Sequence, residues 1–371
     1  TPTSPPPLRM PTPPRRAPAG TASRERDAAR VPPASVPPPG ARPLARTHDP
    51  PYGAPMTSSL LRTHRFDALR PGPRLIVLGG VHGNETCGSV ALARLAAEFD
   101  AGDLVLTRGT VTLVPVANPL ARALGRREGE RNLNRMLRPT AVPRDNEDRI
   151  ANRLCPLLDA HQVLLDLHSF HTGGEPFAMI GPEDNDGPIE PFAQAAAEQA
   201  FAASLGAPRV VEGWLDTYAR GVRRRRERDG ASPYADPEYG VGTTEYLRSR
   251  GGIAVTLECG QHEDPRAPDF AHRAVLRALV HLRMAAVEVE PAPPPRELLR
   301  LVEVFDRLHP GDRLARAWTS FEPIRAGEPI GVRHDGTPVP APADGRVVFP
   351  NPNASVGAEW CYFAVPSPRR L

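Results

Sequence analysis

The sequence contains no lysine, few aromatic residues and no long apolar run. All 46 basic side chains are therefore arginine, and with 43 acidic side chains they leave a net charge of only +3 over 371 residues. A charge this small gives no electrostatic case for binding nucleic acid. No apolar run approaches the ~20 residues that a membrane-spanning helix needs. We therefore expect neither nucleic acid nor a membrane among the partners.

Cysteine is also scarce. The four cysteines, at positions 87, 155, 259 and 361, are scattered and form no Cys-x-x-Cys pair. This distribution gives no disulfide framework and no paired thiolate metal site. It favours a reduced, cytoplasmic setting.

Composition divides the chain into parts. Residues 1–55 are rich in Pro, Arg, Ala and Ser and lack periodic apolar residues, so we expect disorder there. We also expect that native translation begins at Met56 and that 1–55 is an upstream extension. Residues 56–290 are predicted to form a catalytic domain and 291–296, with Pro291 and Pro293–Pro295, a stiff linker. Residues 297–371, with short strand-like runs between Gly, Pro and Asp turns, predict a small all-β domain.

Residues 57–289 alternate between strand-like and helix-like segments. This alternation predicts an α/β fold with three layers, α/β/α, around a mostly parallel or mixed sheet. The expected strands are 74–79, 104–107, 110–116, 162–168, 208–212 and 253–258. The expected helices are 86–99, 146–160, 189–205 and 268–288. The run of arginines at 223–226 predicts a solvated loop, or alternatively a positive rim that attracts anions.

The most informative motif, Gly-Gly-Val-His-Gly-Asn-Glu at 79–85, lies between an apolar strand and a helix. It places His82 and Glu85 where α/β sheets carry their chemistry. His168, in the sequence Asp-Leu-His-Ser at 166–169, ends a second apolar strand. Imidazole and carboxylate are ligands of catalytic zinc, which takes three protein ligands and leaves one position open. His171 is a competing candidate, but we prefer His168 because it ends the strand.

A carboxylate at the end of a third strand is a candidate base. Glu258 follows the apolar run 253–257, and such a carboxylate can accept a proton from metal-bound water. The alternative role of Glu258 is that of a partner in a structural ion pair. Cys259 is expected to point to the opposite face, because successive strand residues alternate. Between the two metal motifs, Asn-Leu-Asn-Arg at 132–135 offers donors that could bind a carboxylate.

These motifs occur in one order: Gly-Gly-Val-His-Gly-Asn-Glu, Asn-Leu-Asn-Arg, Asp-Leu-His-Ser, and Leu-Glu-Cys-Gly at 257–260. Together they resemble the succinylglutamate desuccinylase/aspartoacylase family, a branch of the zinc carboxypeptidase-like hydrolases. The resemblance spans about residues 72–371. It implies a zinc carboxypeptidase-like domain followed by a barrel-sandwich-like β-domain similar to lipoyl or biotinyl carrier domains. A carrier role is excluded, because it needs a lysine for attachment.

The resemblance also implies roles for individual residues. His82, Glu85 and His168 would bind one Zn²⁺, Glu258 would be the general base, and Arg127 would polarise the scissile carbonyl. Asn134 and Arg135 match the residues that bind the substrate carboxylate, and Arg248 matches an arginine that contacts an acidic substrate side chain. Arg126 and Arg250 are neighbouring alternatives to Arg127 and Arg248. Thr244 stands where the family has a tyrosine, a departure that bears on recognition of an acidic side chain.

The predicted function is therefore hydrolysis of the amide bond of a small N-acyl amino acid. The acyl group and the amino acid stay open, as does the oligomeric state. A zinc carboxypeptidase acting on peptides is the nearer alternative, although a β-domain that narrows access favours small substrates. A non-catalytic binding protein with the same fold is the more distant alternative.

Overall fold

The computed structural model describes residues 60–188, 190–230 and 236–370. The predictions of a disordered segment 1–55 and of a start at Met56 lie outside these residues. Within the described part of the chain, no helix is both long enough and apolar enough to cross a membrane.

Four parallel strands form the centre of the main sheet, in the order β3-β2-β4-β7. They are β2 (Arg74–Leu78), β3 (Thr110–Val114), β4 (Val163–Phe170) and β7 (Ile253–Gln261). Nearly every residue of these strands is buried, which explains their largely apolar sequences. β1 (His64–Asp67) pairs antiparallel with β3 at the sheet edge.

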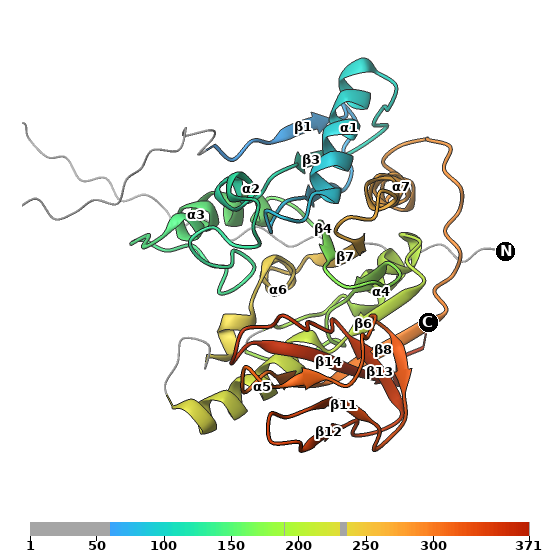
Figure 1. The fold of residues 1–371 in the computed structure, drawn as a ribbon. Coiled ribbons are helices and arrows are strands. Elements are labelled where there is room, and N and C mark those ends of the chain that lie inside the picture. Colours follow the sequence, from blue (N-terminus) through green and yellow to red (C-terminus); the bar gives the residue numbers. More distant parts are fainter. Residues whose placement is uncertain (1–59, 189, 231–235, 371) are drawn as a thin grey trace, which may run out of the picture. The chain divides into compact units, whose positions relative to one another are not determined.

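Helices cover both faces of these strands (Figure 1). On one face α1 (Cys87–Ala101) packs against α7 (Ala267–His281) and against β4. On the other, α3 (Asn146–Asp159) and α6 (Thr243–Ser249) share an apolar core with β2, β4 and β7. Alternate residues of each strand face opposite layers, so each strand contributes to two cores. The prediction of a mixed α/β fold is confirmed.

The sheet continues beyond β7 into the C-terminal part of the chain. β5 (Phe177–Met179) pairs antiparallel with β7, and β6 (Arg209–Glu212) is parallel to β5. β8 (Glu297–Asp306), which follows the proline-rich segment 291–296, is parallel to β6. A hydrogen-bonded connection therefore joins the N-terminal α/β part to the strands after residue 296.

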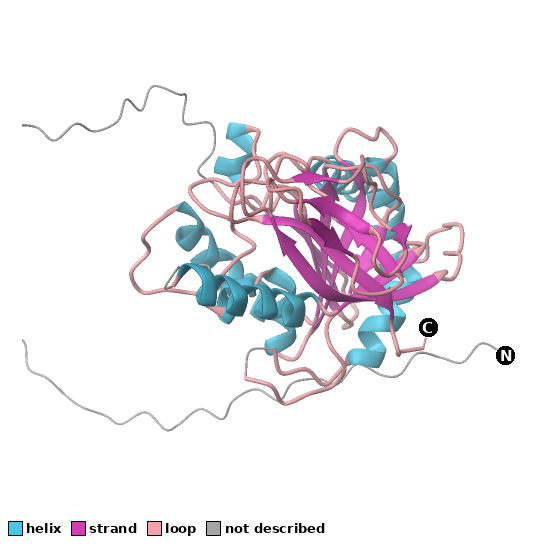
Figure 2. Ribbon diagram, turned by 60° about the horizontal axis from the view of Figure 1, so that its bottom comes forward, coloured by secondary structure: helices cyan, strands magenta, loops and turns pink. Residues whose placement is uncertain are grey.

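The region after residue 296 consists of strands, as expected, and these strands form two groups. β14 (Glu359–Pro366), β13 (Gly345–Val348) and β10 (Glu322–Ile324) follow β8 in the main sheet, which reaches eleven strands. A second sheet has the order β12-β11-β9. Its strands are β9 (Arg313–Leu314), β11 (Pro329–Val332) and β12 (Pro338–Pro340). Figure 2 shows the strands gathered between the helices.

Several predicted elements differ from the observed ones. The segment 104–107 forms no strand; Leu106 makes only an isolated bridge to Ala285. The helix expected from 189 begins later, as α4 (Ala195–Ser204), where the side chain of Asp184 accepts the Ala195 amide. Six elements of the described residues were not predicted from the sequence: β1, α2 (Pro119–Leu124), β5, α5 (Trp214–Asp229), the 3₁₀ turn η2 (Pro237–Gly240) and α6.

The prediction of a solvated loop at the arginine run is wrong, because these residues belong to α5. Helical periodicity turns Arg225 inward while Arg224 stays at the surface. The guanidinium of Arg225 donates to both carboxylate oxygens of Asp306 in β8, at 2.6 and 3.0 Å, and both side chains are buried. The ion pair fastens α5 to the C-terminal strands.

We expect Arg225→Met to lower the free energy of unfolding by about 3 kcal/mol, because it leaves the buried Asp306 carboxylate with only the more distant Arg228, at 3.6 Å, as an ion-pair partner among the described residues. Urea unfolding measures this loss. Arg224→Met is the matched control: Arg224 pairs with Glu303 at the surface, where such a pair contributes about 1 kcal/mol or less. Equal losses in the two variants would contradict the structural role of Arg225.

Candidate metal centre and active site

Three neighbouring parallel strands deliver the site residues to one edge of the sheet. His82 and Glu85 lie in the turn between β2 and α1, and His168 lies near the end of β4. β4 and β7 pair so that His168 is directly opposite Glu258. The turn after β2 packs against α2 so closely that a Cβ on Gly83 would lie 2.0 Å from the Ala121 backbone. Glycine is therefore required at position 83.

His82, Glu85 and His168 form a buried group that can hold a metal ion. Their candidate ligand atoms all lie within 4.8 Å of one another, and each residue is 2–3% exposed. The Glu85 carboxylate lies between the two rings, 2.8 Å from Nδ1 of His82 and 2.9 Å from Nδ1 of His168. Two imidazoles and one carboxylate are a donor set of catalytic metal sites.

The other nitrogen of each ring faces an oxygen. Nε2 of His82 lies 3.1 Å from Oδ1 of Asn132, and this oxygen also accepts the Asn134 amide. Because the oxygen can only accept, Nε2 carries the proton and Nδ1 is left free for a metal. Nε2 of His168 lies 3.0 Å from Asp166, near enough for an ion pair but not aligned as a hydrogen bond.

Burial and the charges of neighbouring side chains shift the pKa values of these three residues. Burial, together with the charge of Arg127, lowers the pKa of His82 to about 4, so its ring is neutral at pH 7. Burial alone would raise the pKa of Glu85, but the two histidines lower it well below its usual value. Burial would lower the pKa of His168, but Asp166 and Glu85 raise it well above the usual value. These charges stabilise an ionised Glu85.

Glu258 lies beside this group and differs from Glu85 in its hydrogen bonding and in the direction of its pKa shift. It is 7% exposed, and its Oε2 has no hydrogen-bond partner among the described residues. Burial raises its pKa to about 8. A buried carboxyl oxygen without a partner is costly in a folded protein and often marks a functional group. Cys259, the next residue along β7, is buried, as expected of a small filler of the core, and its thiol donates to the Leu257 carbonyl at 3.4 Å.

Of the two arginine pairs left open by the sequence, one member of each lines the cavity. Arg127 does so, and its Nη1 donates to Glu85 at 2.9 Å, whereas Arg126 donates to the carbonyls of its own loop. Arg248 lines the cavity, whereas Arg250 is exposed and pairs with Asp159.

The guanidinium of Arg248 is already engaged. It pairs with Glu190, Glu198 and Glu245, and the side chain is 3% exposed. Its predicted contact with a substrate carboxylate stays a prediction, and these carboxylates compete for the same donors.

Asn134 and Arg135 occupy the loop after α2. Oδ1 of Asn134 accepts the Thr243 amide at 2.8 Å, which joins the loop to the start of α6. The Arg135 guanidinium lies 5.0 Å from the ring centre of Trp214 and 5.4 Å from that of Tyr218. Both residues line the cavity. Their predicted role in binding a carboxylate stays a prediction.

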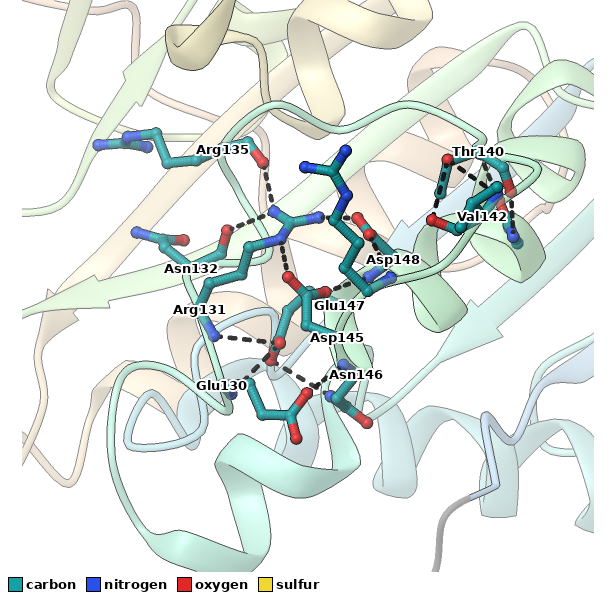
Figure 3. A network of polar contacts seen from close by, with 12 residues as sticks. Glu130, Arg131, Asn132, Arg135, Thr140, Val142, Asp145, Asn146, Glu147 and Asp148 are labelled. Carbon is teal, nitrogen blue, oxygen red and sulfur yellow. Dashed lines mark hydrogen bonds and ion pairs between the residues drawn. The ribbon is translucent and has the colours of Figure 1, made fainter. Parts of the chain in front are cut away.

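Figure 3 shows how the Asn-Leu-Asn-Arg loop is held in place. Nη1 of Arg131 donates to the carbonyls of Asn132 and Arg135, at 3.2 and 2.8 Å. The same guanidinium donates to Asp145 and Asp148 at the start of α3, at 2.9 and 2.8 Å. Arg131 therefore fixes the loop against the helix.

The cavity beside the metal-ligand group has a volume of about 1160 Å³. The C-terminal strands supply part of its wall, including Tyr362 of β14, whose buried hydroxyl has no partner among the described residues. His262, which follows β7, also lines it and lies 2.8 Å from the Ser169 hydroxyl. Neither residue was predicted from the sequence. No local motif marks Tyr362, because its place depends on pairing between β8 and β14.

A second group of potential metal ligands lies in the C-terminal strands. His309 and His334 are exposed and their rings stack at 3.9 Å, and the ligand atoms of both and of the buried Asp312 lie within 4.8 Å of one another. The oxygens of Asp312 already accept backbone amides and the Arg333 guanidinium. This carboxylate stabilises a turn, and a cation would compete with Arg333 for it.

Fold and site together define the class of protein: an α/β protein whose mixed sheet carries a buried His-Glu-His group at the ends of parallel strands. The family model described as the succinylglutamate desuccinylase/aspartoacylase catalytic domain matches residues 71–282. The chain belongs to the succinylglutamate desuccinylase/aspartoacylase family, as its motifs predicted.

Two curated relatives match a shorter stretch. An N-alpha-acetyl-L-2,4-diaminobutyric acid deacetylase of Halomonas elongata is 32% identical over 117 residues, 29% of this chain and 31% of that protein. An N-acyl-aromatic-L-amino acid amidohydrolase (carboxylate-forming) of Rattus norvegicus is 41% identical over 113 residues, 27% of this chain and 34% of that protein. The match thus spans about a third of each relative.

Solved structures are similar over most of the chain. The succinylglutamate desuccinylase/aspartoacylase of Rhodobacter sphaeroides has a TM-score of 0.62 at 20% identity, covering 83% of this chain and 90% of that one. A product-bound ectoine utilization protein of Ruegeria pomeroyi has a TM-score of 0.61 at 23% identity, covering 82% and 88%. At these identities the similarity establishes the fold.

We expect Asn132→Ala to weaken binding of a divalent metal by about 10- to 100-fold, because it removes the oxygen that orients His82. Competition with a chromophoric chelator measures the affinity. Asn134→Ala is the matched control, because Asn134 lies in the same loop and its side chain accepts from Thr243 instead of a metal ligand. Unchanged affinity in Asn132→Ala would refute this role of Asn132.

Proposed function

We propose that the protein is a zinc-dependent hydrolase that cleaves the amide bond of a small N-acyl amino acid, releasing a carboxylic acid and a free amino acid. The observation that carries the proposal is the carboxyl oxygen of Glu258 that has no partner in the described part of the chain, because Glu258 lines the same cavity as the metal-ligand group. Family membership and the names of the two curated relatives, both of which act on N-acyl amino acids, support the reaction class.

The donor set of His82, Glu85 and His168 fits a zinc ion, with the rings oriented by Asn132 and Asp166. When bound, zinc would lower the pKa of a coordinated water and withdraw electron density from a substrate carbonyl. The roles of these three residues as ligands are part of the proposal.

The remaining roles belong to the side chains of the cavity. Glu258 accepts the proton of the attacking water and returns it to the departing nitrogen, a task suited to a carboxyl whose pKa burial raises to about 8. Arg127, which is half exposed and lines the cavity, donates to the oxygen that becomes negative. One well-placed donor of this kind contributes about 3–4 kcal/mol to the transition state. Asn134 and Arg135 hold the α-carboxylate of the substrate.

A second candidate is hydrolysis of a peptide at its carboxyl end. The size of the cavity favours it, because about 1160 Å³ exceeds the usual range of ~300–1,000 Å³ for small-molecule sites. A side-by-side assay of N-acetyl amino acids and of di- and tripeptides separates the two candidates. Release of amino acids from peptides alone would replace the deacylase proposal.

We expect Glu258→Gln to reduce kcat by at least about 100-fold while zinc stays bound, because the amide cannot accept the proton. Amine release from N-acetyl amino acids and zinc content by mass spectrometry measure the two effects. Glu128→Gln, at an exposed carboxylate that lines the same cavity, is the matched control. Substantial turnover by Glu258→Gln would exclude Glu258 as the base.

We also expect a chelator to abolish amine release and added zinc to restore it, because a zinc ion held by His82, Glu85 and His168 would activate the attacking water. The measurement is activity before and after dialysis against chelator, with circular dichroism to verify the fold. Protein that contains no metal as isolated, binds none and shows no activity would leave a binding protein on this fold. Chelator-resistant activity would exclude the metal mechanism.

A further inference from the structure

One wall of the cavity holds more negative charge than positive charge. Arg248 of α6 is ringed by three carboxylates: Nη1 lies 2.7 Å from Glu190 and 3.5 Å from Glu245, and Nε lies 2.9 Å from Glu198. Nη2 donates to the Ala254 carbonyl at 2.6 Å. One guanidinium therefore faces three acidic groups, and these carboxylates form no ion pair with a second cation among the described residues.

The three carboxylates are not equally satisfied. Glu198 also accepts two backbone amides, at 2.6 and 2.7 Å, and acts as a structural link between α4 and β7. Glu245 accepts the Gly242 amide and so caps its own helix. Glu190 has Arg248 as its sole polar contact among the described residues. Of the three, Glu190 retains the most capacity to accept from a ligand.

The excess of negative charge affects the pKa of Glu190. Burial raises the pKa of Glu190 to about 7, against the lowering effect of Arg248, and Glu245 and Glu198 raise it further. The shift agrees with the geometry: a single guanidinium does not compensate the carboxylates around it. A cation near Glu190 would stabilise the ionised form and relieve this repulsion.

This wall belongs to the same cavity as the proposed reaction centre. Glu190, Glu245 and Arg248 line it together with Thr256 and Glu258 of β7. Thr256 and Glu258 are two residues apart on a strand, so their side chains point to the same side. Glu258 is 7% exposed, and its Oε2 has no partner among the described residues, which independently points to a polar ligand of this cavity.

Resting on the function proposed above, we propose that the substrate is an N-acyl amino acid whose side chain carries a cation, such as a primary ammonium, and that Glu190 is the carboxylate that selects it. Arg135 and Glu190 contact different elements, α5 and α6, which allows one to receive the α-carboxylate and the other the side-chain ammonium. An anionic side chain would have to displace a glutamate from Arg248 and would meet the remaining carboxylates. Repulsion of like charges in a buried site disfavours it.

The test compares three substrates that differ in side-chain charge: Nα-acetylornithine, Nα-acetylnorvaline and N-acetylglutamate. The full chain, loaded with zinc, is assayed for amine release at pH 8, where Glu190 is largely ionised. We expect kcat/KM for the ornithine derivative to exceed that for the norvaline derivative by at least about 10-fold, the size of a charge-assisted hydrogen bond. The glutamate derivative should be the poorest. Preference for glutamate, or equal rates for all three, would overturn the proposal.

Glu190→Gln assigns the selectivity to one residue. We expect it to reduce the ratio of ornithine to norvaline kcat/KM by about 10-fold. A variant that lowers both rates equally would show a structural role and refute selection by Glu190. Glu183→Gln is the matched control, because Glu183 lines the same cavity, is exposed and makes no contact with Arg248. A matching loss of the ratio in this control would mean that general negative charge, and not Glu190, selects the substrate.

A binding measurement separates failure of this proposal from failure of the proposed function. Calorimetric titration of the wild-type chain with free ornithine, norvaline and glutamate needs neither turnover nor a folded variant. If no acetyl derivative is hydrolysed but ornithine binds at least about 10-fold tighter than the other two, the deacylase function fails and the cation-selective wall stands. If amines are released but glutamate binds tightest, the function stands and the cationic substrate is refuted.

Discussion

Parallel pairing of β2, β4 and β7 is the constraint on which the site depends. The pairing places Leu78 opposite Asp166, and His168 opposite Glu258. Because side chains alternate between the faces of a strand, a shift of one residue would turn His168 away from Glu85 and toward the opposite layer. The strands are buried on both faces, so such a shift would also move polar residues into the apolar cores. The same burial that stabilises the sheet thus sets the geometry of the site.

Burial also explains why the site is assembled from coupled charges. Glu85 is ionised between two imidazoles and Arg127. Glu258, which is opposite His168 in the strand pairing, has a raised pKa and a carboxyl oxygen without a partner among the described residues. Two carboxyl groups of one chemistry are therefore driven to different protonation states by their surroundings. The loop with Asn132 takes part because Arg131 holds it against α3 (Figure 3). The orientation of His82 consequently depends on charges at the start of a helix.

The C-terminal strands both extend the main sheet and supply part of the cavity wall. β8 pairs with β6, so the main sheet continues without interruption into this region. β14 then brings Tyr362 to the cavity wall, and the Arg225–Asp306 pair fastens α5 to β8. The cavity is therefore bounded in part by residues that lie outside the region matched by the family model, residues 71–282. That these strands favour small substrates stays a prediction, because the cavity volume of about 1160 Å³ could also hold a larger substrate.

The sequence by itself determined the mixed α/β fold, the family and the position of the motifs at strand ends. It could do so because apolar runs of strand length followed by glycine, histidine or glutamate are local signals, and parallel strands end at one edge of a sheet. The structure brings His82, Glu85 and His168 together at that edge. The sequence could not reveal that Arg225 is the buried member of the arginine run, since a run of charged residues has no local feature that distinguishes a buried arginine from exposed ones. Nor could it reveal that Arg248 pairs with Glu190 and Glu198, 58 and 50 residues away along the chain. Only tertiary packing decides such partners, because the energy of a buried charge depends on which opposite charges and donors the fold places around it.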